Sequence, residues 1–137
     1  MKFKFLVIML ALTACMGSSK PTPAKADPYT AAPAGMTFDT YLAQVKQAHL
    51  VLVDFNATWC GPCKTLKPIV QKVIRKNGGR VILMDVDVDQ NPVVANTMNI
   101  KAIPLLILYK DGKEVWRNMG LTDEQTISDK IDFHAKS

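Results

Sequence analysis

Two short and almost uninterrupted apolar runs, residues 50–57 (LVLVDFNA) and 80–88 (RVILMDVDV), limit the folds that are open to this chain. Apolar residues at nearly every position predict strands that are buried on both faces, as in parallel sheets. Segments with helical spacing stand beside these runs, at residues 37–47 and 60–76. A strand–helix–strand order joins parallel strands through a helix that covers the sheet. The sequence therefore predicts an α/β fold.

The second half of the domain continues this order and then changes it. Residues 91–99 (NPVVANTMN) have Pro92 at the start of a short helical pattern. Asp111-Gly112 separates two strand patterns, and an Asp-Gly pair is a strong hairpin signal. Residues 122–136 have an acidic first turn and predict a closing amphipathic helix. The predicted order α-β-α-β-α-β-β-α gives a central mixed sheet flanked by helices, which ends in an antiparallel hairpin and a C-terminal helix.

The N-terminus has the pattern of an export signal. Lys2 and Lys4 precede an apolar run at residues 5–14 (FLVIMLALTA). This run is about half as long as a membrane-spanning helix needs to be. A short apolar core after a positive start predicts a signal peptide.

A lone cysteine follows that core directly. Residues 12–15 (LTAC) resemble the lipobox of bacterial lipoproteins, which implies cleavage after residue 14 and lipidation of Cys15. Several acyl chains would anchor the protein stably to a membrane. The alternative is an ordinary secretory signal with an incidental cysteine. Met16 stands where an aspartate usually retains lipoproteins at the inner membrane, which favours the periplasmic side of the outer membrane over the outer face of the cytoplasmic membrane.

Composition divides the rest of the chain. Residues 16–35 hold four of the eight prolines and a single aromatic residue, too little apolar surface to fold. We therefore predict a signal peptide at residues 1–14, a lipid-anchored flexible tether at residues 15–35 and a globular domain at residues 36–137. The net charge is +5, but the basic residues are scattered and form no run. We expect a monomer without a nucleic-acid partner.

Residues 59–63 (WCGPC) lie between a predicted buried strand and a predicted helix. Cys60 and Cys63, three positions apart on one helical face, are close enough for a disulfide. Cys60 falls at the helix N-terminus, where unpaired N–H groups and the helix dipole stabilise a thiolate. The pattern suits one exposed, acidified thiol and one shielded partner.

Other uses of a cysteine pair fit this sequence less well. A zinc site needs a second Cys or His pair, which the sequence lacks. A structural disulfide would stabilise more by closing a longer loop. A Cu(I) site stays open, because thiolates suit soft metals.

From about residue 36 to residue 135 the sequence resembles the thioredoxin family. The motifs that carry the resemblance are VDFNATWCGPCK at residues 53–64, Pro68, VDVDQNP at residues 86–92, IPLLILYKDGK at residues 103–113, and Gly120. The resemblance implies a thioredoxin-like fold and a thiol–disulfide oxidoreductase whose only redox group is its own cysteine pair, with no cofactor.

The same resemblance implies a role for each site residue. Cys60 is the attacking thiolate, Cys63 is the resolving cysteine, and a buried Asp54 helps to move the proton of Cys63. Pro104 matches a cis-proline that faces the disulfide and lets the backbone of Ile103 pair with a substrate strand. Substrate binding is implied for four further residues, Trp59, Gly61, Pro62 and Gly120. A packing role is the alternative for Trp59.

Four features depart from the family pattern. Asn56 stands where many thioredoxins have a large aromatic residue, and Asp85 stands where a lysine often lies near the buried aspartate. Leu105 replaces the threonine that usually follows the cis-proline. The family's first strand is not evident before Met36.

The Gly61-Pro62 pair resembles the dipeptide of reducing thioredoxins. The expected function is reduction of protein disulfides outside the cytoplasm, with disulfide-containing proteins as substrates. Because that compartment is oxidising, a reductase there needs a membrane electron donor, or else the enzyme runs in the oxidising direction. The alternative from another class is a non-catalytic adaptor or a copper carrier.

Overall fold

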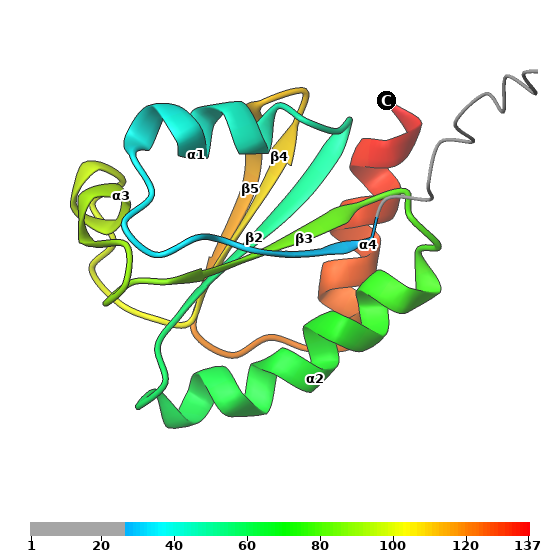
Figure 1. Cartoon of the computed structure of the whole chain (residues 1–137). Helices are drawn as coiled ribbons and strands as arrows, with labels where there is room; N and C mark the ends of the chain where they lie inside the picture. Colours follow the sequence, from blue (N-terminus) through cyan, green and yellow to red (C-terminus); the bar gives the residue numbers. More distant parts are fainter. Residues whose placement is uncertain (1–26) are drawn as a thin grey trace, which may run out of the picture.

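The computed structural model describes residues 27–137 (Figure 1). The predicted signal peptide, Cys15 and the tether up to residue 26 lie outside the described residues. The elements in chain order are β1 (Tyr29–Ala31), α1 (Phe38–Val45), β2 (Leu50–Asn56), α2 (Gly61–Lys76), β3 (Ile82–Asp87), α3 (Pro92–Thr97), β4 (Leu105–Lys110), β5 (Lys113–Met119) and α4 (Glu124–Lys136). This order confirms the predicted α/β fold and adds one strand at its start. Within the described residues, no helix combines the length and the hydropathy that crossing a membrane requires.

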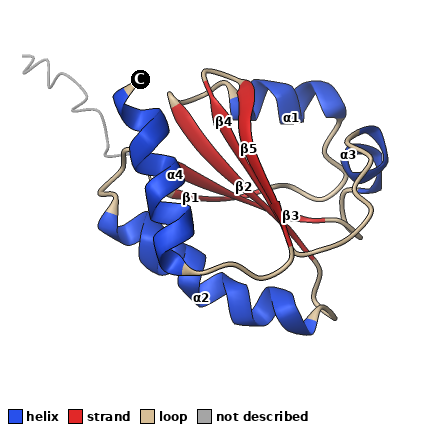
Figure 2. Cartoon of the chain, turned by 180° about the vertical axis from the view of Figure 1, so that it is seen from behind, coloured by secondary structure: helices blue, strands red, loops and turns tan. Residues whose placement is uncertain are grey.

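The five strands form one mixed sheet in the order β1-β3-β2-β4-β5. Strand β2 lies at its centre, parallel to β3 and antiparallel to β4. Helices α1 and α3 cover one face of the sheet, and α2 and α4 cover the other (Figure 1, Figure 2). A sheet that is covered on both faces explains why the β2 sequence is apolar at nearly every position.

Strand β2 divides the core into two layers by the alternation of its side chains. Val51, Val53 and Phe55 pack in the cluster under α1 and α3. Leu50 and Leu52 pack in the cluster under α2 and α4. By the same alternation, the next even-numbered residue, Asp54, points to the α2 side. The chain therefore places a carboxylate in the layer where an apolar side chain would continue the pattern.

The first strand corrects a predicted boundary. Tyr29–Ala31, which the sequence placed in the tether, pairs in parallel with β3, and Tyr29 lies beside Leu83. The Tyr29 hydroxyl also donates a hydrogen bond to the backbone oxygen of Gln71 in α2 at 2.8 Å. Composition did not reveal this strand. Three residues at a sheet edge are held mainly by backbone hydrogen bonds and need no apolar run, and prolines are tolerated beside them. The domain therefore begins before Met36.

The hairpin between β4 and β5 is confirmed at Asp111-Gly112. Asp111 has φ +49° and Gly112 has φ +78°, the conformation that a tight hairpin turn of this kind requires. A side chain on Gly112 would also collide with Lys46, whose Cγ lies 2.5 Å from the position of an added Cβ. Both constraints favour glycine at this turn.

Candidate active site

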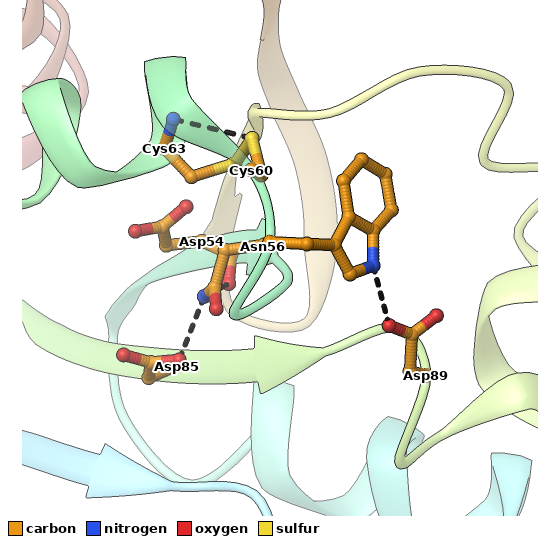
Figure 3. Close-up of a disulfide and its surroundings, with 7 residues drawn as sticks. Asp54, Asn56, Cys60, Cys63, Asp85 and Asp89 are labelled. Atoms are coloured by element: carbon orange, nitrogen blue, oxygen red, sulfur yellow. Dashed lines mark hydrogen bonds between the residues drawn. A yellow bond between two sulfur atoms is a disulfide. The ribbon is translucent and has the colours of Figure 1, made fainter.

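Cys60 and Cys63 form a disulfide where α2 begins, with 5.3 Å between their Cα atoms (Figure 3). Cys60 is the N-cap residue of α2 and has an extended backbone. The backbone N–H of Cys63 points at Sγ of Cys60, with 3.2 Å between nitrogen and sulfur. After reduction, this N–H and the helix dipole favour a thiolate on Cys60.

The bridge is covered in its oxidised form. Cys60 is 3% exposed and Cys63 is 5% exposed, so the predicted contrast between an exposed and a shielded cysteine is absent. The reason is that Ala57, Val88 and Ile103 pack together with the two cysteines. Val88 and Ile103 come from other parts of the chain, which the local pattern of residues 59–63 could not indicate.

Pro104 and Gly120 are joined by a backbone hydrogen bond. The peptide bond between Ile103 and Pro104 is cis, in agreement with the resemblance. The carbonyl of Pro104 accepts a hydrogen bond from the N–H of Gly120 at 2.8 Å. Gly120 has φ +86°, and an added Cβ would meet nothing within 4 Å. Backbone conformation, not close packing, therefore explains this glycine.

An apolar groove of about 450 Å³ opens on one side of the bridge. Trp59, Val88 and Ile103 form its wall near the cysteines, and α3 with residues 100–102 forms the far wall. The Trp59 side chain is 69% exposed, and its Nε1 donates a hydrogen bond to Oδ2 of Asp89 at 2.7 Å (Figure 3). Trp59 is therefore a surface residue at the groove, and a packing role is excluded.

Of the other predicted substrate-binding residues, Ile103 also lines this groove, whereas Gly61, Pro62, Pro104 and Gly120 do not. Gly61 and Pro62 are exposed in the first turn of α2. Met119 and Leu121 flank Gly120, and more than half of each side chain is exposed. Exposed apolar side chains therefore occur at Trp59 on the groove and on both sides of Gly120.

A second cavity, of about 320 Å³, lies beside Cys63 and is lined by several polar and charged residues. Asp54 contributes to it and is only 3% exposed. Its Oδ1 accepts no hydrogen bond from residues 27–137. Burial raises the pKa of Asp54 to about 7, the Asp85 charge adds to this rise, and Lys67 opposes it. Asp54 can therefore take up and release a proton near neutral pH, next to Cys63.

Two of the departures from the family pattern lie here: Asn56 lines this cavity, and Asp85 is hydrogen-bonded to Asn56. Nδ2 of Asn56 donates hydrogen bonds to Oδ1 of Asp85 at 2.7 Å and to the backbone oxygen of Asp54 at 3.1 Å (Figure 3). The sequence did not single out Lys67, whose Nζ donates to Oδ2 of Asp85 at 2.6 Å. The spacing of four from Cys63 to Lys67, which places both on one face of α2, is the signal that could have found it.

Leu105, the remaining substituted position, is a core residue. It is 1% exposed, and it pairs with Phe55 in β2 and with Met119 in β5. Its side chain therefore contributes to the layer under α1 and α3. Across residues 27–137, no three His, Cys, Asp or Glu side chains are grouped so as to hold a metal ion.

Known proteins with similar sequences are thioredoxins. The family model for thioredoxin matches residues 32–133. A thioredoxin of Chlamydia trachomatis is 44% identical over 85 residues, which cover 62% of this chain and 82% of that protein. A thioredoxin of Chlamydia pneumoniae is 41% identical over 98 residues, which cover 72% of this chain and 91% of that protein.

Solved structures agree with these sequence relationships. A thioredoxin mutant from Halobacterium salinarum superimposes with a TM-score of 0.69 at 28% identity, covering 78% of this chain and 90% of that one. The thioredoxin of Malassezia sympodialis gives a TM-score of 0.67 at 28% identity, over 80% of this chain and 95% of that one.

Proposed function

Since this chain belongs to the thioredoxin family and is a thiol–disulfide oxidoreductase, we propose that it reduces disulfides of proteins outside the cytoplasm while a lipid on Cys15 holds it at a membrane. The observation that carries the reaction is the Cys60–Cys63 disulfide at the start of α2, with the apolar groove on one side and buried Asp54 on the other.

The reaction exchanges one disulfide for another. The Cys60 thiolate attacks a sulfur of the substrate disulfide, whose S–S bond breaks as a mixed disulfide forms and one substrate thiolate leaves. Cys63 then gives its proton to the Asp54 carboxylate and attacks Sγ of Cys60. This second step breaks the mixed disulfide, releases the other substrate thiolate and forms the Cys60–Cys63 disulfide. The substrate gains two electrons and the cysteine pair loses them.

The surface around the groove supports a protein substrate. The exposed side chain of Trp59 lies on the groove beside a bridge that is itself covered. A protein substrate with apolar side chains beside its cysteine can cover Trp59 and the groove. This burial of apolar surface adds binding free energy that a small disulfide cannot supply. We therefore expect substrates to be proteins with apolar residues near an accessible disulfide.

The proposed location rests on the export signal and the LTAC sequence at residues 12–15. Because β1 belongs to the domain, the proposed tether from Cys15 to Tyr29 spans fourteen steps along the chain. At roughly 3 Å per residue, these steps reach about 40 Å. The domain would thus work close to the membrane, where a membrane donor can return the two electrons that each turnover removes.

Two measurements on the full-length protein in cells test this proposal. The mature protein should begin at Cys15, carry a lipid mass increment and partition into detergent, and Cys15→Ala should abolish processing or anchoring. Thiol trapping should find the Cys60–Cys63 pair reduced when a membrane donor is present and oxidised when it is deleted. Soluble protein cleaved elsewhere would refute the anchor, and a pair that stays oxidised with every donor would establish the oxidising direction.

A further inference from the structure

Two carboxylates stand side by side beneath α2. Asp54 in β2 and Asp85 in β3 are register partners in parallel strands, so their side chains point to the same face of the sheet. Like charges at directly neighbouring positions repel each other. A buried, ionisable Asp54 beside a second carboxylate therefore needs compensation if it is to accept a proton near neutral pH.

Lys67 supplies that compensation from the helix above. Its Nζ lies 2.6 Å from Oδ2 of Asp85, while Asn56 holds the other oxygen, Oδ1, at 2.7 Å. The Asp85 carboxylate is thus held on both sides, by a cation from α2 and by an amide from β2. The hydrogen bond to Asp85 is also the main cause of the raised pKa of Lys67.

The ion pair stands between two cavities. Lys67 lines the cavity that contains Asp54 and Cys63, and it also lines a neighbouring cavity of about 270 Å³ near β1 together with Asp85. The titratable groups around these spaces are Asp54 on β2, Asp85 on β3, Cys63, Lys64 and Lys67 on α2, and Tyr29 on β1. Among them, Lys67 is the cation bonded to the carboxylate beside Asp54.

We propose that Lys67 is a positioning residue for resolution, which acts through Asp85 to let Asp54 accept the proton of Cys63 near neutral pH. The proposal rests on the proposed disulfide reduction, because it concerns the second step of that reaction. With the ion pair intact, the charge of Asp85 is balanced and Asp54 ionises in the working range. Without Lys67, the unbalanced Asp85 charge keeps the proton on Asp54 to higher pH, and Cys63 loses its acceptor.

The test measures the pH profile of resolution in full-length protein. Stopped flow follows the release of 2-nitro-5-thiobenzoate from its mixed disulfide with Cys60, between about pH 5 and pH 9. Lys67→Met should move the midpoint upwards by about half a unit to one unit, a modest shift because the Lys67 side chain is half exposed. Lys67→Arg should restore the original midpoint. In an Asp85→Asn background, Lys67→Met should shift the midpoint less, because only the direct effect of the lysine charge on Asp54 remains.

Lys72→Met is the matched control. Lys72 lies on the same helix and forms an ion pair with Glu124 at 2.7 Å, outside the Asp54 cavity, with a similarly exposed side chain. This variant loses the same charge and should keep the original midpoint. An unchanged profile in Lys67→Met, or an equal shift in Lys72→Met, would overturn the proposal.

A second measurement separates this proposal from the proposed function. The carboxyl infrared band of Asp54, assigned with Asp54→Asn, should titrate at higher pH in oxidised Lys67→Met than in the unaltered protein. If the unaltered protein reduces disulfides, but Lys67→Met changes neither the midpoint of resolution nor the midpoint of the infrared titration, this proposal alone fails. If the unaltered protein reduces no disulfide, the proposed function fails, and the infrared titration still decides the role of Lys67.

Discussion

The two sides of the Cys60–Cys63 bridge differ in the side chains that line them. On one side lies an apolar groove of about 450 Å³ beside Trp59 and Ile103, which is open to a polypeptide. On the other lies a cavity of about 320 Å³, whose lining includes the ionisable side chains of Asp54 and Lys67. The bridge thus separates substrate binding from proton transfer. Changes on one side should alter affinity, and changes on the other should alter pH dependence.

Removing either cysteine should have the largest effect, because both sides act through the bridge. Cys60→Ser should lower disulfide reduction to the uncatalysed rate, since the attacking sulfur is lost. Cys63→Ser should trap substrates as mixed disulfides through Cys60, visible on non-reducing gels and by mass spectrometry. Equal trapping by Cys60→Ser would show that the two roles are reversed. If neither substitution changes the binding of protein partners, a non-catalytic adaptor is favoured.

The charge on Asp54 should lower the stability of the fold. The Asp54 pKa is about 7 in the folded protein and 3.8 when exposed, so the native state holds this proton more tightly than the unfolded state does. The stabilisation from this group is therefore full below about pH 4, declines as the pH rises towards 7, and is lost above it. At pH 8, Asp54→Asn should raise the free energy of unfolding by about 4 kcal/mol, and at pH 4 by much less.

Denaturant unfolding of the oxidised protein at both pH values measures this effect. Asp129→Asn, which changes an exposed carboxylate on α4, is the matched control and should show no such pH dependence. The Asp54→Asn variant, although more stable, should resolve mixed disulfides about 10- to 100-fold more slowly at pH 7, because Cys63 has lost its proton acceptor. A variant that is stabilised and also fully active would remove Asp54 from the mechanism.

The sequence predicted those features that depend on neighbours along the chain. Cys60 stood out because a helical pattern begins beside it, and the resemblance to the thioredoxin family pointed to Asp54. The features that it missed depend on distant contacts. Lys67 meets Asp85 across α2 and β3, eighteen positions apart. Likewise, Ile103 covers the bridge from a separate segment.

Trp59→Ala should give the smallest of these effects, confined to the groove side. Its side chain is 69% exposed, so its loss should leave the fold intact and remove apolar surface that a protein substrate would cover. We expect KM for a protein disulfide to rise about 5- to 10-fold, equivalent to about 1 kcal/mol, while reduction of a small disulfide changes little. Phe133→Ala, with a side chain 68% exposed on α4, is the matched control and should change neither rate. The pH profile of Trp59→Ala should equal that of the unaltered protein, whereas Lys67→Met should move the profile and leave KM in place. A Trp59→Ala variant with a displaced profile would show that the groove and the Asp54 cavity are coupled through the bridge.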